Sequence, residues 1–232
     1  MLRLDKFLSG ANLGSRSQVK EYLKQGLVRV NGEVVRKPEY KIEEGKDQVS
    51  FREKEIIYKK YVYYMLNKPQ GVVSATRDRI HGTVSDLLKD TGYRDLFPVG
   101  RLDRDTEGLL IMTNDGGLAH DLLSPKKHVE KVYYVETARP LSEESRKALE
   151  KGVDIGEEKI SLPAKAERIS DTSIYLTITE GKYHQVKRML HAVENEVVYL
   201  KRTAMGGLFL DENLPCGSYR ELTEEEVRKM RE

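Results

Sequence analysis

Residues 100–116 read Gly-Arg-Leu-Asp-Arg-Asp-Thr-Glu-Gly-Leu-Leu-Ile-Met-Thr-Asn-Asp-Gly, a charged loop that runs directly into an apolar strand. Loops at strand ends commonly carry reactive side chains, because the strand holds them in place. Three acids fall within five residues, and each needs a counter-ion or water to stay charged in an apolar pocket. The alternative is a solvated turn with local hydrogen bonds to the backbone, which we favour for Asp105 and Glu107.

A second charged group lies at residues 180–190, Glu-Gly-Lys-Tyr-His-Gln-Val-Lys-Arg-Met-Leu, where a strand ends and a basic helix begins. Cations in a first helical turn oppose the helix dipole, so an anion or a carboxylate from elsewhere in the chain is expected nearby. Lys187 is the candidate for that pairing. His184 has no second metal ligand three or four residues further along the chain, which favours a structural or RNA-contact role over a general base or metal ligand.

The pattern beyond residue 60 predicts a strand-dominated α+β fold. β-Branched and aromatic residues predict strands at 61–66, 109–112, 132–137 and 174–179. Helical spacing and caps predict helices at 118–123, 142–151, 185–191 and 223–231. Tyr133 and Tyr134 are consecutive on one predicted strand and therefore point to opposite faces, so one of them is expected in the core.

The first sixty residues differ in charge from the rest of the chain. They hold fourteen Lys and Arg against nine Asp and Glu, although the whole chain has a formal charge of only +2. Ser15-Arg16-Ser17-Gln18 is a capping box that opens a helix, and Asn31-Gly32 predicts a two-residue hairpin turn. A third short strand is predicted at 48–51, completing a module of two helices and three strands.

Cations are spread over this module and offer phosphate contacts, although an ordinary solvated surface is an equal alternative from charge alone. They are Arg3, Lys6, Arg16, Lys20, Lys24 and Arg29. The charged stretch 53–60 resembles a tether, so we expect domains at 1–58 and 59–232.

The lone Cys216 excludes an internal disulfide and favours a reducing compartment, so a cytoplasmic location is expected. No stretch approaches eighteen consecutive apolar residues, and the start of the chain lacks the pattern of a signal peptide. Membrane association is therefore not expected.

Two resemblances to known families follow from these motifs. Arg3-Leu4-Asp5-Lys6-Phe7-Leu8, Ser15-Arg16-Ser17 and the hairpin from Gly26 to Gly32 resemble the S4 RNA-binding domain. The rest of the chain resembles the pseudouridine synthases. That likeness rests on 67–71 (Asn-Lys-Pro-Gln-Gly), 100–109, Glu130-Lys131-x-Tyr133 and 181–189, in the expected order. The resemblance implies a mostly antiparallel mixed sheet as the catalytic domain.

The resemblance also implies residue roles. It assigns Asp103 as the catalytic carboxylate, Lys187 as its cationic partner and Tyr133 as the aromatic that stacks on the uracil, which leaves Tyr134 on the core side. Arg101 would hold the nucleotide turned out of its helix, and Asn67 and Lys68 would contact the substrate. Breaking the bond from ribose C1′ to N1 and joining C5 to C1′ involves no net redox change, so neither a cofactor nor a metal is expected.

The stretch 181–189 is closest to the branch of the family that modifies small-subunit ribosomal RNA at uridine 516 of the 16S molecule. Large-subunit relatives more often have Asn in place of Tyr183 and Arg in place of Lys187. Ribosomal RNA or an assembly intermediate is therefore the expected partner, and the chain is expected to act as a monomer.

Three alternatives stay open. A large-subunit (23S) pseudouridine synthase differs in substrate only. Mg²⁺-dependent phosphoryl transfer is suggested by the paired acids Asp103 and Asp105. In enzymes of that class the acidic loop follows a strand, and a Thr comes four residues after the first Asp. Here the loop precedes the strand, and Thr106 comes three residues after Asp103. A non-catalytic RNA-binding or ribosome-assembly factor would use the S4-like module alone.

Overall fold

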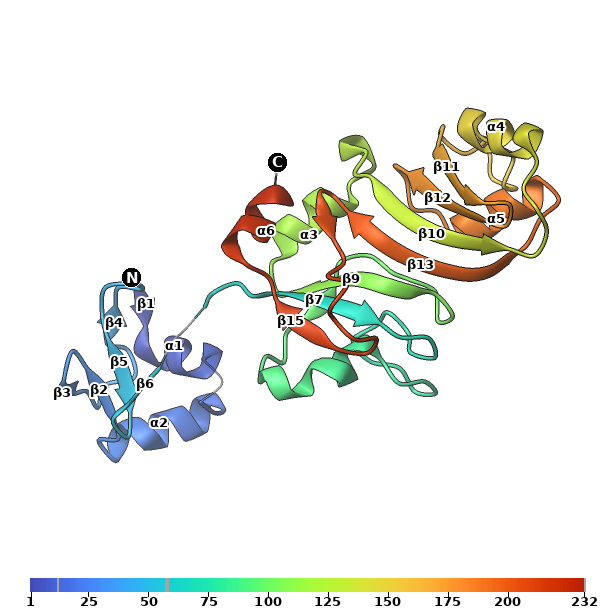
Figure 1. The fold of residues 1–232 in the computed structure, drawn as a ribbon. Coiled ribbons are helices and arrows are strands. Elements are labelled where there is room, and N and C mark those ends of the chain that lie inside the picture. The colour runs from blue at the N-terminus through green and yellow to red at the C-terminus, as the bar shows by residue number, and fades with distance from the viewer. Residues whose placement is uncertain (12, 57–58, 232) are drawn as a thin grey trace. The chain divides into compact units, whose positions relative to one another are not determined.

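The computed structural model describes residues 1–11, 13–56 and 59–231. The chain forms two compact units, Met1–Tyr61 and Val62–Glu232 (Figure 1). The units meet after Tyr61, slightly later in the chain than the boundary that we expected after residue 58. Part of the expected tether is ordered strand, because Lys54–Glu55 pairs with Val49–Phe51. Residues 57 and 58 of that stretch lie outside the described residues.

Both helices predicted in the first unit are present, and the second begins at its predicted cap. Helix α1 (Leu4–Gly10) buries Leu4 and Leu8, and α2 (Arg16–Lys24) buries Val19 and Leu23. The predicted capping box is present: Ser15 Oγ accepts from the Gln18 backbone N–H, and Gln18 Oε1 accepts from the Ser15 backbone N–H. These apolar faces form the core of a unit that is otherwise highly charged.

The strands of the first unit are short. The predicted hairpin joins β2 (Val28–Val30) to β3 (Glu33–Val34), with Asn31 and Gly32 at φ of +51° and +85°. The other edge of β2 pairs with β5 (Val49–Phe51), which confirms the third predicted strand. Sequence reasoning missed three strands of two residues each, too short to show any periodicity. They are β1 (Leu2–Arg3), β4 (Lys41–Ile42) and β6 (Lys54–Glu55).

The second unit is built on a nine-stranded sheet in the order β11-β12-β10-β13-β9-β7-β15, with β14 on β13 and β8 on β9. Neighbouring strands are antiparallel except β9 and β13, which are parallel, so the expected α+β class with a mixed sheet is confirmed. The bounds are β7 Tyr63–Lys68, β8 Phe97–Pro98, β9 Glu107–Thr113, β10 Lys131–Thr137, β11 Lys165–Ser170, β12 Ser173–Ile178, β13 Val197–Met205, β14 Leu208–Phe209 and β15 Tyr219–Glu221.

Helices cover both faces of this sheet, and all four predicted ones are present within a few residues of their expected ends. Figure 1 shows α4 and α5 at the β11–β12 end and α3 and α6 toward the other end. Sequence reasoning missed the two 3-10 segments η1 and η2. No helix among the described residues is long and apolar enough to cross a membrane. The bounds are η1 Val84–Thr91, α3 Gly116–Leu123, η2 Pro125–Lys127, α4 Glu143–Lys151, α5 Gln185–Ala192 and α6 Glu224–Lys229.

Strand β9 lies at the centre of the unit. Leu110 and Met112 belong to the core on one face of the sheet, and Leu109 and Ile111 belong to the core on the other. A strand buried on both faces shows a continuous apolar run instead of alternation, which explains the run at 109–112. The charged loop before β9 is therefore attached to one of the most deeply held strands in the fold.

Gly108 lets β9 and β13 approach each other. Its φ is +102°, and a Cβ at this position would lie 2.2 Å from the backbone oxygen of Arg202. A side chain would therefore push the two strands apart, whatever its type. This close approach brings the loop at 100–106 next to β13, where the two halves of the sheet meet.

Candidate active site

The loop between β8 and β9 positions Asp103. Gly100 opens it at φ +75°, and the Thr106 backbone N–H closes a turn onto the Asp103 carbonyl at 3.1 Å. The Asp103 side chain is 27% exposed, so it reaches a pocket while remaining partly screened from water. The loop presents one carboxylate inward at the start of a rigid strand.

Helix α5 brings Lys187 to this carboxylate. The Lys187 Nζ lies 3.1 Å from Asp103 Oδ2 and 2.5 Å from Asp105 Oδ1. The partner expected for a cation in the first turn of this helix is thus a pair of carboxylates from the loop at 100–106. We expected Asp105 to lie in a solvated turn. Its side chain is exposed, as expected, but it also forms an ion pair with Lys187, which was not expected.

The charges of this cluster stabilise one another. Burial lowers the pKa of Lys187, but hydrogen bonds with Asp105 and Asp103 outweigh that effect and raise the pKa above the ordinary lysine value. Burial acts to raise the pKa of Asp105, but its hydrogen bond with Lys187 leaves that pKa lowered. Lys187 therefore stays protonated at neutral pH and compensates the negative charge of the loop.

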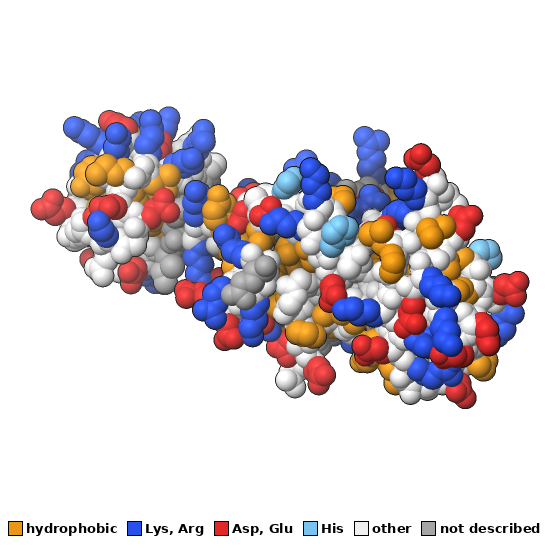
Figure 2. Space-filling view, turned by 90° about the horizontal axis from the view of Figure 1, so that it is seen from above, with side chains coloured by type: hydrophobic (Ala, Val, Ile, Leu, Met, Phe, Trp, Pro, Cys, Tyr) orange, Lys and Arg blue, Asp and Glu red, His pale blue; other side chains and the backbone are white. Residues whose placement is uncertain are grey.

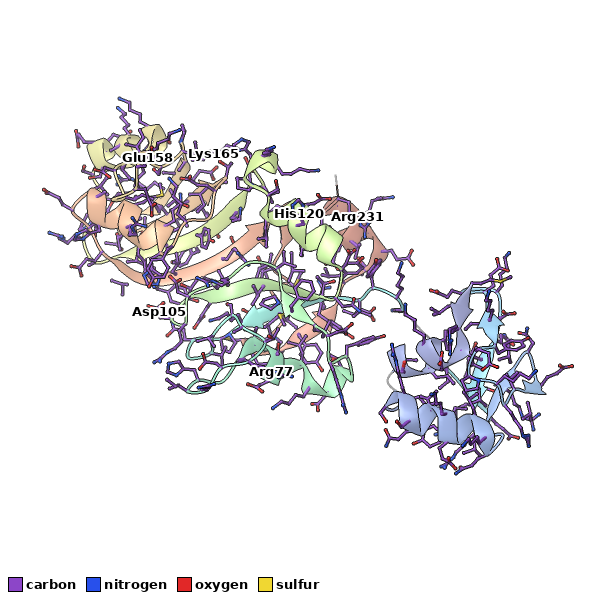
Figure 3. The ribbon with its side chains drawn as sticks, turned by 180° about the vertical axis from the view of Figure 1, so that it is seen from behind. Arg77, Asp105, His120, Glu158, Lys165 and Arg231 are labelled. Atoms are coloured by element: carbon purple, nitrogen blue, oxygen red, sulfur yellow. The ribbon has the colours of Figure 1, made fainter. Side chains whose placement is uncertain are left out.

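Asp103 and Lys187 line a pocket of about 120 Å³ between the loop, α5 and the sheet. Tyr133 on β10 and Leu200 on β13 supply an aromatic and an aliphatic wall, and Arg101 lies exposed at its rim. Figure 3 labels Asp105, which lies beside this pocket, in the loop that precedes β9. The arrangement offers a flat ring a stacking surface next to a carboxylate that is paired with an ammonium group.

His184 is the residue before α5 and has a left-handed backbone, with φ of +48°. Its ring stacks on the exposed Tyr183, with ring centroids 3.8 Å apart, and its Nε2 lies 3.5 Å from Asp103 Oδ1. Sequence reasoning gave His184 no contact with the acid. The structure therefore brings a ring nitrogen of His184 close to one carboxylate oxygen of Asp103, while Lys187 lies at the other.

Two buried cations in the pocket lining were missed as site residues by sequence reasoning. Lys131 is 8% exposed, and burial together with the nearby charge of Arg202 lowers its pKa to about 8. Arg202 is 2% exposed; its Nε donates to the Leu109 carbonyl at 2.8 Å, while its Nη2 has no hydrogen-bond partner among the described residues. The spacing of two residues was the available signal, because residues i and i+2 of a strand share a face, which puts Arg202 beside Leu200.

The two neighbouring tyrosines do face opposite sides, but their predicted places need correction. Tyr133 is 8% exposed and belongs both to the pocket and to the core. Tyr134 was expected on the core side and is instead half-exposed on the other face, where its hydroxyl donates to Glu136 at 3.0 Å. Its ring meets Tyr175 and Tyr199 edge-on, with no helix covering it.

Glu107 also departs from the solvated turn expected for it. It begins β9, and its Oε2 accepts from the Tyr199 hydroxyl at 2.7 Å. Burial contributes most to raising the pKa of Tyr199, and the hydrogen bond with Glu107 raises it further. Glu107 therefore anchors the end of the loop to β13 and points away from Asp103.

Asn67 and Lys68 do not reach the surface, so the expectation that they contact RNA is corrected. Asn67 donates from Nδ2 to the Leu214 carbonyl at 2.8 Å. The Lys68 ammonium is fully buried and donates to the carbonyls of Asp103 and Thr106, at 3.0 and 2.9 Å, and to that of Pro69 at 3.0 Å. Lys68 holds both ends of the turn that presents Asp103.

Replacing Lys68 tests this positioning role. Burial lowers the pKa of Lys68 to about 8, so below that pH the native state carries a poorly solvated ammonium. Lys68→Met removes that cost but leaves buried carbonyls without a donor, at about 1–3 kcal/mol each. Because these effects oppose each other, we expect the melting temperature to change little while turnover falls more than about tenfold. Turnover equal to that of the exposed control Lys89→Met would contradict the role.

The cations of the first unit lie on its surface. Arg16, Lys20 and Lys24 recur every fourth residue along the exposed face of α2 and form one stripe. Figure 2 shows Lys and Arg side chains gathered along one edge of this unit. Lys6 is also exposed, whereas Arg3 pairs with Asp5 at 2.8 Å and Arg29 donates to the Gly32 carbonyl at 3.0 Å.

A metal site is the other arrangement that paired acids could form. Within residues 1–11, 13–56 and 59–231, no three His, Cys, Asp or Glu side chains gather closely enough to hold a metal ion. The space between Asp103 and Asp105 is taken by the ammonium of Lys187. The two carboxylates therefore pair with a lysine of the protein itself, which disfavours the phosphoryl-transfer alternative.

A basic helical stripe on one unit and an acid–lysine pocket with an aromatic wall on the other define an RNA-modifying enzyme. The family model for RNA pseudouridylate synthases matches residues 62–192, and the S4 domain model matches residues 2–49. The chain belongs to the RNA pseudouridylate synthase family and carries an S4 domain, as the motifs implied.

Three similar proteins cover nearly the whole chain. An uncharacterized RNA pseudouridine synthase of Bacillus subtilis, YtzG, is 50% identical over all of this chain and 99% of its own length. Ribosomal small subunit pseudouridine synthase A of Escherichia coli is 42% identical over 97% of this chain and 98% of its own. A crystal structure of a pseudouridylate synthase, 39% identical, superposes with a TM-score of 0.70 over 99% of this chain and all of that one.

Proposed function

We propose that this pseudouridine synthase acts on small-subunit ribosomal RNA and that uridine 516 of the 16S molecule is its target. The observation that carries the reaction type is the Lys187 ammonium 3.1 Å from the Asp103 carboxylate in a pocket walled by Tyr133. The choice of RNA is supported by similarity to relatives named for the small subunit, such as the Escherichia coli protein. We place its action in the cytoplasm, as a monomer.

The reaction requires a charged acid in a site with little water. Asp103 either attacks the nucleoside or removes a proton from it, and a carboxylate does both better when ionised. The Lys187 ammonium supplies a positive charge 3.1 Å from Asp103 Oδ2. Tyr133 stacks on the uracil while the freed base turns, and its hydroxyl carries a proton once C5 has joined the sugar.

Access to the base comes before chemistry. A uridine within a stacked or paired region must leave the helix to enter a pocket of about 120 Å³. Arg101 at the rim can hold the phosphate or sugar of the extruded nucleotide. An RNA loop or junction fits best, because its bases are less constrained than those of an A-form duplex.

The stripe on α2 supplies affinity without reading sequence. Replacing Arg16, Lys20 and Lys24 together by Gln removes up to three phosphate contacts, so we expect the slope of log affinity against log salt to fall by about two to three. Salt titrations of binding to 16S RNA measure this slope. The matched control replaces Lys37, Lys41 and Lys46, which are equally exposed on another part of the unit. Equal slopes for both triple variants would show that the stripe is not the anchor.

Mapping pseudouridines in ribosomal RNA from cells with and without the protein tests the substrate. Loss of one pseudouridine from small-subunit RNA, restored by the purified protein, supports the proposal. Loss from large-subunit RNA would favour the 23S alternative, and loss from neither would leave a non-catalytic RNA-binding role. If the conversion of uridine to pseudouridine proceeds unchanged in excess EDTA, Mg²⁺-dependent phosphoryl transfer is ruled out.

A further inference from the structure

Ile80 is an apolar side chain held out in solvent. It is 84% exposed, more than any other large hydrophobic residue described except Met1. It lies at the tip of a loop, residues 73–83, between β7 and η1, which we call the Ile80 arm. Arg77 and Arg79, which precede it in the chain, are also exposed. An isoleucine close in sequence to two arginines buries nothing in the protein and gains from a partner that is apolar inside and anionic outside.

The tip of the Ile80 arm has a fixed shape. Asp78 Oδ1 accepts from the backbone N–H groups of Ile80 and His81, at 2.9 and 2.8 Å. The hydrogen bonds from His81 and Ile80 lower the pKa of Asp78, which keeps this turn in place at neutral pH. The parallel bridge between Val73 and Thr83 closes the base of the arm. A tip that is already ordered loses little freedom when it inserts into a partner.

The Ile80 arm is fastened to the loop that carries Asp103. Ser74 Oγ donates to the Leu102 carbonyl at 2.8 Å and accepts from the Leu102 backbone N–H at 3.0 Å. Arg104 Nη1 lies 3.2 Å from Nε2 of His81. In Figure 1 the segment after β7 and the loop before β9 extend from the same side of the sheet. The arm and the catalytic carboxylate therefore hold a fixed position relative to each other.

We propose that Ile80 is a wedge that enters the base stack beside the target uridine while Arg77 and Arg79 bind the flanking phosphates. The inference rests on the proposed function, since only an enzyme that extrudes a base needs to fill the space left behind. Apolar side chains inserted between base steps unstack them and help hold the nucleic acid open. RNA matches both features of the tip, with flat apolar base faces inside a phosphate backbone.

The test compares two synthetic RNA fragments that contain the uridine located by mapping. One keeps the natural neighbours of that uridine, and the other carries abasic sites on both sides, which remove its stacking. Ile80→Ser should lower single-turnover conversion of the natural fragment about tenfold and leave conversion of the abasic fragment near the wild-type rate. Ile80→Leu, which keeps the apolar bulk, should convert both at wild-type rates.

A second readout follows extrusion directly. A 2-aminopurine placed next to the target should brighten when wild-type protein binds and should stay dim with Ile80→Ser. Ile160→Ser is the matched control, because Ile160 is 57% exposed in the loop after α4 and does not touch the pocket. It should behave as wild type in both assays.

Four results would overturn the wedge. Wild-type rates and fluorescence for Ile80→Ser would show that the tip does not enter the stack. An equal loss on both fragments would show that Ile80 supports the fold of the loop instead. A loss seen only on ribosomal particles would assign the tip to a protein partner. If wild-type protein converts neither fragment, the proposed substrate fails first and the wedge fails with it.

Discussion

Asp103→Asn should abolish isomerisation while leaving RNA affinity nearly unchanged. The substitution keeps the size of the side chain but removes the negative charge that Lys187 faces at 3.1 Å. An amide is a poor nucleophile and a poor base, so turnover should fall at least about a thousand-fold, or about 4 kcal/mol of barrier. Single-turnover conversion of ribosomal RNA measures the loss, and filter binding measures affinity.

Asp90→Asn is the matched control, because Asp90 is an exposed acid on η1 outside the pocket lining. It should keep wild-type turnover and affinity. An Asp103→Asn variant that retained even a tenth of turnover, a loss of about 1.4 kcal/mol, would contradict the catalytic assignment. Full biological function of that variant would favour the RNA-binding alternative, which needs no reactive carboxylate.

Local signals in the sequence predicted most of the secondary structure. The capping box at Ser15 and the turn at Asn31-Gly32 act within a few residues, so they could be read directly. Strand β13 (Val197–Met205) was missed, although it is the longest strand described. Its sequence shows no alternation of polar and apolar residues, because Lys201, Arg202 and Thr203 are consecutive.

The site was harder to predict than the fold, because its contacts join residues far apart in sequence. The charge pattern of the helix at Lys187 predicted an anionic partner but could not show that Asp105 shares it with Asp103. The resemblance assigned Lys68 to substrate contact, whereas the carbonyls of the loop hold its ammonium in the interior. Such burial depends on how the loop folds back, which no local pattern encodes.

Lys187→Met should lower turnover about a hundred-fold, which corresponds to about 2.8 kcal/mol of barrier. The ammonium lies between two carboxylates, and its removal leaves Asp103 and Asp105 facing each other without a cation. Like charges at such distances disfavour the ionised state that the reaction needs. The exposed control Lys126→Met should keep wild-type turnover, as measured by single-turnover conversion of the same RNA.

Charge and packing make different contributions at this position, and two further variants separate them. Lys187→Arg keeps the cation and should recover much of the lost turnover, although a planar guanidinium fits the two acids differently. Adding Asp105→Asn to Lys187→Met removes the uncompensated second charge, so the double variant should be faster than Lys187→Met alone. A merely structural Lys187 predicts the reverse, because the double variant loses one more hydrogen-bonding partner of the loop. Equal rates for Lys187→Met and wild type would remove Lys187 from the mechanism.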